Sequence, residues 1–370
     1  MLGGRTPVPY RPFPAARQWR GLSEPAPHLV PMRYLKLVVG IVLLFALFQF
    51  GVLDLKSIAL AASHPVALAA ATVLLLGTLL VQSLRWHLLL RAQGFAFRWA
   101  KTLQIVLTGA FFSSFLPGAY GGDVVRAVYL YRATSAKQTS ALLSVAMDRI
   151  VGLSGLLTLG LGVSLFHPAG ITGASAWGFY ALALAFLAGN AGVLLYGHRL
   201  ARYAGTRLPK RLARLGPIVD QVSDALECYM QRWPTVVACW ALSVVLFALA
   251  VGALLCVTAI FRYGSLTWSE YSIAGVWSIL ANALPFTPGG IGVGEGAFAQ
   301  ACLLMETAPS GAPYGTVFLV YRAINILSTV PGVIAYYLYR QETLVHSNSL
   351  PNAPAQVPAM ETLPGTDTPK

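Results

Sequence analysis

Six charged residues stand within apolar stretches of this sequence, where a bilayer would make charge costly. They are Asp123, Arg126, Asp148, Arg149, Glu295 and Arg322. A charged side chain at the centre of a bilayer costs about 2.5–3.5 kcal/mol on insertion scales, so it usually faces a cavity or a partner. An arginine presents a planar fork of donors that suits phosphate. We therefore expect these residues to line a polar pocket that accepts an anion.

The arginines Arg149 and Arg322 are the best candidates for binding a phosphate-bearing headgroup. Arg322, Asn325 and Thr329 fall at i, i+3 and i+7, so they form one polar stripe on a helix. Asp148 and Arg149 are adjacent and point to different sides of their helix, so they are not one simple pair. A second stripe has close helix packing as its alternative explanation. It consists of Ser144, Asp148, Gly152 and Gly155.

Two apolar stretches, residues 102–131 and 271–300, are each interrupted at the middle by proline and glycine. Broken backbone at membrane depth is tolerated only where protein or a water-filled cavity covers it. We expect both stretches to form re-entrant hairpins, which enter and leave the membrane on the same side. The residues that break them are Pro117, Gly121, Gly122, Pro288, Gly289 and Gly290.

The two broken stretches share a pattern of carboxylate and arginine. Asp123 and Glu295 follow a proline by six and seven residues, respectively. Arg149 lies 26 residues after Asp123, and Arg322 lies 27 residues after Glu295. This spacing indicates an internal repeat. With three full crossings in each half the repeats are inverted, which is a recurring plan of transporters.

The carboxylates have two possible roles. A helix is expected to begin near Gly122 and near Gly294, which puts Asp123 and Glu295 in a first turn, where the helix dipole stabilises a carboxylate. In one reading both are helix caps, and the neighbouring glycines are packing notches. In the other they, together with Asp148, pair with arginines or take protons.

The composition predicts an all-α, polytopic membrane bundle. The mean hydropathy is +0.65, and only 11% of residues are charged, too few to cover a water-soluble domain. Apolar runs approach the ~20 residues that span a bilayer. We expect about six full spans besides the two hairpins, at residues 36–53, 65–84, 139–166, 176–197, 235–260 and 317–339.

The predicted organisation has three parts. Residues 1–34 form a disordered, basic, proline-rich arm, and either Met1 or Met32 is the true start. Residues 35–340 form the membrane domain, with repeat halves at about 35–166 and 176–339. Residues 341–370 form a disordered tail.

The distribution of Lys and Arg predicts the orientation. With both termini in the cytosol, only Lys56 and Arg262 of the 26 basic residues lie outside, and only Arg149 and Arg322 lie within spans. This indicates a multi-pass protein of the inner (plasma) membrane. The cytosolic segments include the basic loop 198–234, which carries a short surface helix or contacts anionic headgroups.

The same layout predicts the positions of two further arginines. It places Arg85 in a cytosolic loop at 85–101. It also puts Arg126 near the cytosolic rim, where a snorkelling charge is an alternative to a role in the pocket.

No cofactor or metal is predicted. The four cysteines form no C-x-x-C pair, the histidines show no ligand spacing, and no phosphate-binding G-x-x-x-x-G-K-[ST] stretch is present. The net charge of +13 is explained by the cytosolic segments, so we expect no nucleic-acid partner.

Four motifs resemble a known family, the lysylphosphatidylglycerol synthase transmembrane region or flippase-like domain. They are FLPGAYGGDVVRAVYLYR, SVAMDRIVGL, LPFTPGGIGVGEGAF and VYRAINIL. The resemblance implies an inner-membrane protein that handles lipids, with lipid flipping as the usual proposal. Bifunctional members carry a synthase domain after the membrane region. Only about 30 residues follow Arg340, so we expect the membrane half alone.

Three functions are compatible with these observations. The first is translocation of a phosphate-bearing lipid between leaflets, with a membrane lipid as substrate and no enzymatic step. The second is a non-transporting partner of a lipid-biosynthesis enzyme. The third is a membrane-embedded enzyme acting on lipid headgroups, for which the buried carboxylates would supply acid–base groups. The inverted repeat and the resemblance favour the first.

Overall fold

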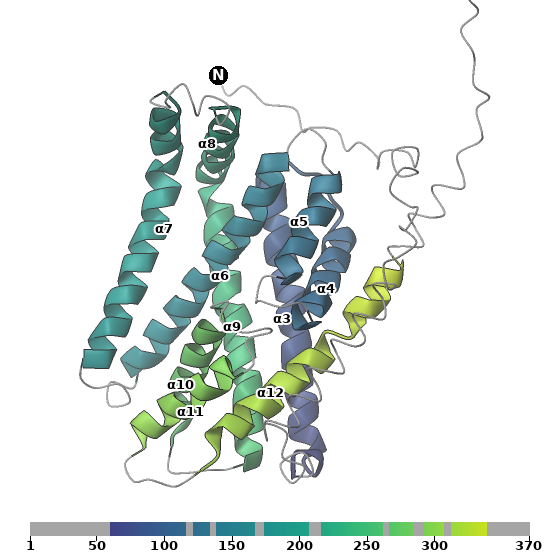
Figure 1. The fold of residues 1–370 in the computed structure, drawn as a ribbon, viewed down its shortest axis with the longest axis vertical. Helices are drawn as coiled ribbons and strands as arrows, with labels where there is room; N and C mark the ends of the chain where they lie inside the picture. The colour runs from purple at the N-terminus through teal and green to yellow at the C-terminus, as the bar shows by residue number, and fades with distance from the viewer. Residues whose placement is uncertain are drawn as a thin grey trace, which may run out of the picture.

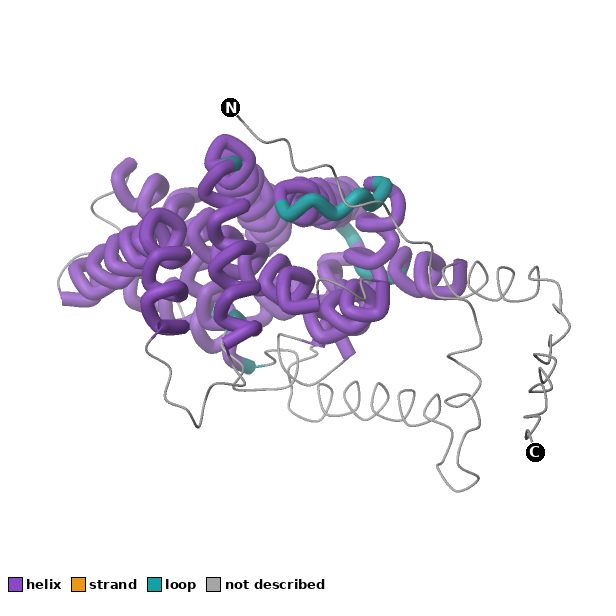
Figure 2. Tube along the Cα trace, turned by 90° about the horizontal axis from the view of Figure 1, so that it is seen from above, coloured by secondary structure: helices purple, strands orange, loops and turns teal. Residues whose placement is uncertain are grey.

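The computed structural model is a bundle of helices (Figure 1). The residues it describes are 60–115, 121–133, 138–166, 174–206, 216–261, 266–283, 292–306 and 312–338. All regular structure within these ranges is helical, and no strand occurs in them (Figure 2). The predicted all-α class is therefore confirmed.

The helix labels follow Figure 1 and begin at α3. The helices are α3 (Pro65–Ala92), α4 (Trp99–Phe115), α5 (Gly121–Ala133), α6 (Gln138–Phe166), α7 (Ala174–Thr206), α8 (Gly216–Gln231), α9 (Trp233–Phe261), α10 (Trp268–Asn282), α11 (Val293–Met305) and α12 (Tyr314–Ser328).

Four described helical stretches are long and apolar enough to cross a membrane. They are Pro65–Ala92, Thr139–Leu165, Trp233–Phe261 and Tyr314–Leu338. Each coincides with a predicted span. The predicted span at 176–197 lies within α7, and the one at 36–53 lies outside the described residues. The count of six spans stays a prediction.

The two interrupted stretches form helix pairs. In the first, α4 packs against α5, and in the second α10 packs against α11. The first pair lies above the second along the vertical axis of Figure 1. The breakers Pro117, Pro288, Gly289 and Gly290 fall between the paired helices, outside the described residues, whereas Gly121 and Gly122 open α5.

Helices α3 and α9 lie side by side and connect the two pairs. Near one end they share a core with α10, α11 and α12, through buried residues such as Leu75, Leu254 and Phe318. Near the other end, Leu89 of α3 and Cys239 of α9 pack with α6 and α8. The second broken helix pair is thereby fixed to α3 and α9, and α4 of the first pair packs against α3.

The last span is not one continuous helix. α12 ends at Ser328, and residues 331–338 form a further helical segment after a turn. Pro331 explains the break, because proline donates no backbone hydrogen bond and disfavours the helical conformation of the residue before it. A side chain at Gly332 would meet the Leu107 carbonyl oxygen at 2.2 Å. The bend thus brings the final segment directly against α4.

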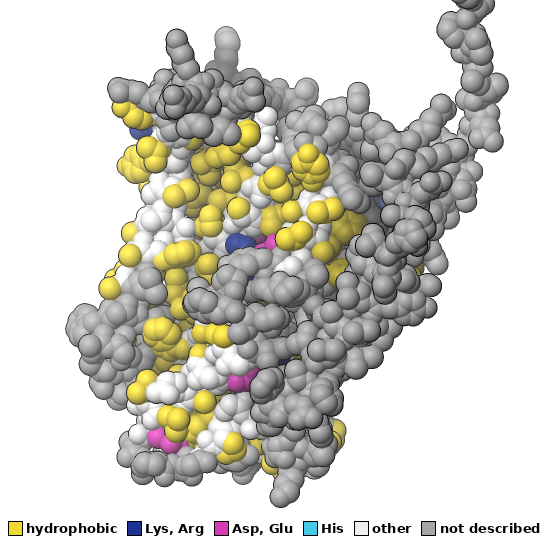
Figure 3. Space-filling view, viewed as in Figure 1, with side chains coloured by type: hydrophobic (Ala, Val, Ile, Leu, Met, Phe, Trp, Pro, Cys, Tyr) yellow, Lys and Arg dark blue, Asp and Glu magenta, His cyan; other side chains and the backbone are white. Residues whose placement is uncertain are grey.

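The surface of the bundle suits a lipid environment. Large apolar side chains are exposed on several helices, among them Leu184, Leu200, Leu304 and Ile334. Figure 3 shows one face, on which hydrophobic side chains prevail and the described charged groups are few. Extended exposed apolar surface is typical of a membrane-interacting protein.

Candidate functional site

The carboxylate of Asp123 binds two arginines at the start of α5. Arg149 Nε on α6 donates to Asp123 Oδ2, and Arg126 Nη1 lies 3.5 Å from Asp123 Oδ1. Asp123 lies in the first turn of its helix, where the helix dipole favours a negative charge. One carboxylate therefore neutralises part of the charge of two cations.

Arg126 is buried rather than placed at a membrane rim. Its side chain is 3% exposed, and its Nη2 lies 2.9 Å from Asp148 Oδ2. Its guanidinium lies over the ring of Trp86, 4.2 Å from the ring centroid, a favourable cation–π geometry. The structure therefore favours a place in the polar network over the snorkelling alternative.

Arg85 also belongs to this network, which the predicted loop at 85–101 missed. Its Nε lies 2.8 Å from Asp148 Oδ1, and its Nη1 donates to Ser243 Oγ at 2.9 Å. The prediction for Arg85 was wrong because α3 continues to Ala92 and carries the side chain into the bundle. A continuous chain of ion pairs results, running Arg85–Asp148–Arg126–Asp123–Arg149.

Arg322 of α12 and Glu295 of α11 form another buried ion pair. Arg322 Nε lies 2.6 Å from Glu295 Oε1, and its Nη2 donates to Oε2 at 3.0 Å, so the contact is a bidentate fork. Glu295 also accepts from the backbone N–H of Gly292, which caps α11. Asn282 Oδ1 accepts from the same Arg322 nitrogen at 3.1 Å.

The glycines beside the two carboxylates have different roles. A Cβ on Gly122 would meet the Gly109 carbonyl oxygen at 2.3 Å, so α4 and α5 approach closely there. In the second pair Gly294 is the crowded position, since a Cβ there would lie 2.9 Å from Arg322 Nη2. Gly292 has a φ of +84°, which favours glycine, and a Cβ on Gly296 would meet no described residue within 4 Å. Packing notches were expected at Gly118, Gly122, Gly292 and Gly296. Of these, Gly122 alone shows a close contact among the described residues, and Gly118 lies outside them.

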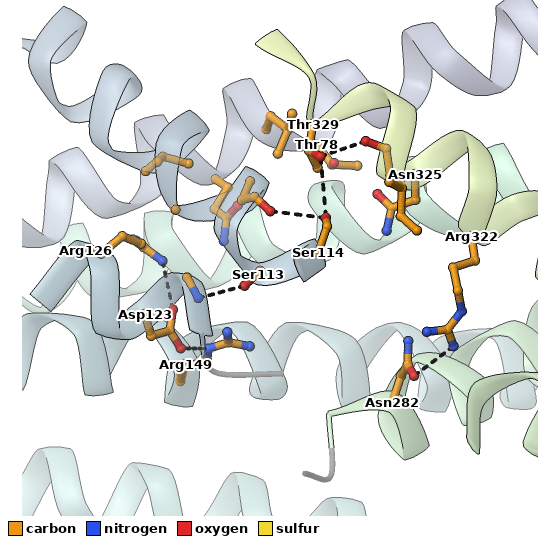
Figure 4. Close-up of a pocket in the computed structure, with 17 residues that line it drawn as sticks. Thr78, Ser113, Ser114, Asp123, Arg126, Arg149, Asn282, Arg322, Asn325 and Thr329 are labelled. Atoms are coloured by element: carbon orange, nitrogen blue, oxygen red, sulfur yellow. Dashed lines mark hydrogen bonds and ion pairs between the residues drawn. The ribbon is translucent and has the colours of Figure 1, made fainter. Parts of the chain in front are cut away.

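A cavity of about 310 Å³ is lined by residues of α3, α4, α5, α6, α10 and α12. Its described charged lining residues are Asp123, Arg126, Arg149 and Arg322. Its described neutral polar lining residues are Thr78, Gln82, Ser113, Ser114, Asn282, Asn325 and Thr329. Figure 4 shows Arg149 and Arg322 approaching from different elements, with Ser114, Asn325 and Thr329 nearby. The polar stripe predicted on the last span thus faces the cavity.

The two ion pairs differ in exposure. The Arg149 side chain is 38% exposed and that of Asp123 is 12% exposed. The Arg322 and Glu295 side chains are 8% and 9% exposed. An anion entering the cavity can therefore approach Arg149 more readily than Arg322.

Comparison with protein families agrees with this architecture. The profile of the lysylphosphatidylglycerol synthase TM region matches residues 34–332. The chain belongs to this family. A search of curated proteins finds no match. As a member of the lysylphosphatidylglycerol synthase TM region family with apolar spanning helices, the chain is an integral membrane protein related to lipid metabolism.

The predicted site residues of this family member divide between the cavity and its support. Asp123, Arg149, Arg322 and Asn325 line the cavity, whereas Asp148 lies behind it at 1% exposure. The stripe on α6 is a packing surface: a Cβ on Gly155 would lie 2.3 Å from Ser243 Cβ on α9. The sequence reading did not single out Arg85 or Asn282. One observation could have indicated Arg85. Asp148 needs a cationic partner, and the adjacent Arg149 points to another side of the helix, so the partner must come from another segment.

Proposed function

We propose that this protein translocates a phosphate-bearing lipid between the two leaflets of the inner membrane, without a chemical step. The observation that carries the proposal is the polar cavity between the two broken helix pairs. Among its described lining residues three are arginines and one is a carboxylate, so the net charge favours an anion. The headgroup would occupy the cavity while the acyl chains stay in the bilayer.

The repeated ion pairs support this function. Asp123–Arg149 and Glu295–Arg322 each join the first turn of a broken-pair helix to the next long helix, and their residues are 26 and 27 positions apart. Such equivalence is expected of a 3+3 inverted repeat, in which the halves rock or exchange around a central site. We propose that both termini lie in the cytosol, as the distribution of basic residues predicts.

The proposed mechanism is an exchange of counter-ions. Arg149 is partly exposed, and Asp123 keeps Arg126 when Arg149 turns to a phosphate. The bidentate fork of arginine suits phosphate as well as carboxylate. The substrate phosphate would therefore replace Asp123 as the partner of Arg149 at a small cost, and leave by the reverse exchange.

A reconstitution experiment tests translocation. The full chain is inserted into vesicles that contain a trace of fluorescent phosphatidylglycerol, and an impermeant reductant bleaches label in the outer leaflet. The proposal predicts that label in the inner leaflet also becomes accessible, at a rate above that of protein-free vesicles. An unchanged rate with correctly inserted protein would overturn it and favour a non-transporting partner of a lipid-biosynthesis enzyme.

A further inference from the structure

We infer that the cavity selects a headgroup of one chemical class: an anionic phosphate joined to a polyol, without an amine. This inference rests on the proposed function, since it names the substrate of the same site. It follows from three properties of the cavity, namely its charge, its neutral polar wall and its size.

The first property excludes an amine by charge. The described residues that line the cavity include a single carboxylate, Asp123, and its oxygens already face Arg126 and Arg149. Glu295 is engaged by the fork of Arg322 and by the Gly292 N–H. Among the lining residues that the structure describes, an ammonium group would thus find no carboxylate without an arginine partner, and it would lie near several guanidinium groups. Removing such a charge from water without a partner is unfavourable.

The second property is a wall of neutral hydrogen-bonding groups. Gln82 and Asn325 both line the cavity and carry side-chain amide groups. Ser114 and Thr329 place their hydroxyl oxygens 3.4 Å apart on the same cavity. Amides both donate and accept hydrogen bonds, whereas the Ser114 and Thr329 hydroxyls donate to the carbonyl oxygens of Ala110 and Ile326 and can accept from a ligand. A polyol, whose hydroxyls also do both, complements such a wall, whereas an ammonium group can only donate.

The third property limits the size of the headgroup. The cavity volume is about 310 Å³, whereas one water molecule needs about 10–15 Å³ on the same measure. This space accommodates a phosphate with glycerol or one sugar ring. The acyl chains are expected to stay in the bilayer. The lipid that fits best therefore has a phosphoglycerol or sugar-phosphate headgroup.

The wall and the arginines should contribute in separable ways. Arg149 would bind the phosphate, which all phospholipids share. Its loss should therefore weaken the binding of every phospholipid alike. Asn325 is exposed on α12 and would form hydrogen bonds with the polyol. Its loss should therefore reduce the preference for a polyol headgroup over an amine-bearing one. Specificity is the difference between two affinities, and only the second variant changes that difference.

The test is lipid binding to the full purified chain in detergent, measured by native mass spectrometry. The probes share their acyl chains and are phosphatidylglycerol, phosphatidylethanolamine and lysyl-phosphatidylglycerol. We expect phosphatidylglycerol to bind at least about tenfold more tightly than either amine-bearing lipid. The preference should shrink in Asn325→Leu but persist in Gln221→Leu, an exposed amide on α8 that does not line the cavity.

The remaining outcomes are equally decisive. Equal or tighter binding of an amine-bearing lipid, or no binding of any probe, would overturn the inference. Competition by free glycerol 3-phosphate at the same concentration as the lipid would show that the polyol phosphate alone is recognised, which supports the inferred class. Unselective flipping in vesicles would refute the selectivity and leave translocation standing. Selective binding without flipping would refute translocation and leave the selectivity standing.

Discussion

Replacing Arg322 by glutamine should destabilise the fold, whereas the same change at Arg149 should leave the fold stable. The Arg322–Glu295 fork is less than 10% exposed on both sides. Removing one partner of a buried ion pair leaves an uncompensated charge and costs about 3–5 kcal/mol. Arg149 is 38% exposed, and Asp123 keeps a second arginine. The cost of removing Arg149 is therefore that of an exposed pair, about 1 kcal/mol or less.

The assay is the thermal midpoint of the detergent-purified protein, followed by size-exclusion chromatography. Arg322→Gln should lower the midpoint by roughly 5 °C or more, and Arg149→Gln by much less. Adding Glu295→Gln to Arg322→Gln should recover much of the loss, because the unpaired carboxylate is removed while an acceptor for the Gly292 N–H remains. Equal losses for both arginine variants, or no recovery in the double variant, would refute the division between a structural and a ligand-binding pair.

Three further substitutions, two of them with a matched control variant, test the packing behind the site. Gly122→Ala should lower the thermal midpoint, because its Cβ would lie 2.3 Å from a backbone oxygen of α4. The control Gly296→Ala should leave the midpoint unchanged, because its Cβ would meet no described residue within 4 Å. Within α6, Gly155→Ala should cost about 1–3 kcal/mol through its clash with α9, whereas Gly162→Ala, in open space, should be neutral. If a test variant and its control have the same stability, the close helix approach at that glycine is contradicted. Asp148→Asn should sharply reduce the yield of monodisperse protein, since two buried guanidinium groups lose their shared counter-ion; a normal yield would contradict that role.

Much of the site could be predicted because a bilayer makes each charge conspicuous. The spacing of Asp123 to Arg149 and of Glu295 to Arg322 marked the residues that form the two ion pairs. The stripe that includes Asn325 faces the cavity because three, four and seven residues are near multiples of a helical turn. Local periodicity was sufficient for these features.

Other features depend on contacts between distant segments, which no local pattern contains. Arg85 follows an apolar run and was assigned to a loop by its charge, yet α3 carries it to Asp148, 63 residues away. A residue at a helix end can equally snorkel to the surface or turn inward, and only its partner decides which. The same holds for Asn282, which meets Arg322 across 40 residues. The bend before Pro331 was foreseeable from the proline alone, although the span was predicted as continuous.

The central claim, that lipid crosses the membrane through the cavity at Arg149, has one most direct test. Flipping of fluorescent phosphatidylglycerol is compared in vesicles containing equal amounts of wild type, Arg149→Gln and Arg202→Gln. Arg202 is the matched control, because it forms an exposed ion pair with Glu227 and does not line the cavity. The account predicts that Arg149→Gln loses most of the flipping rate while Arg202→Gln retains it. Flipping by Arg149→Gln at the wild-type rate would contradict the account.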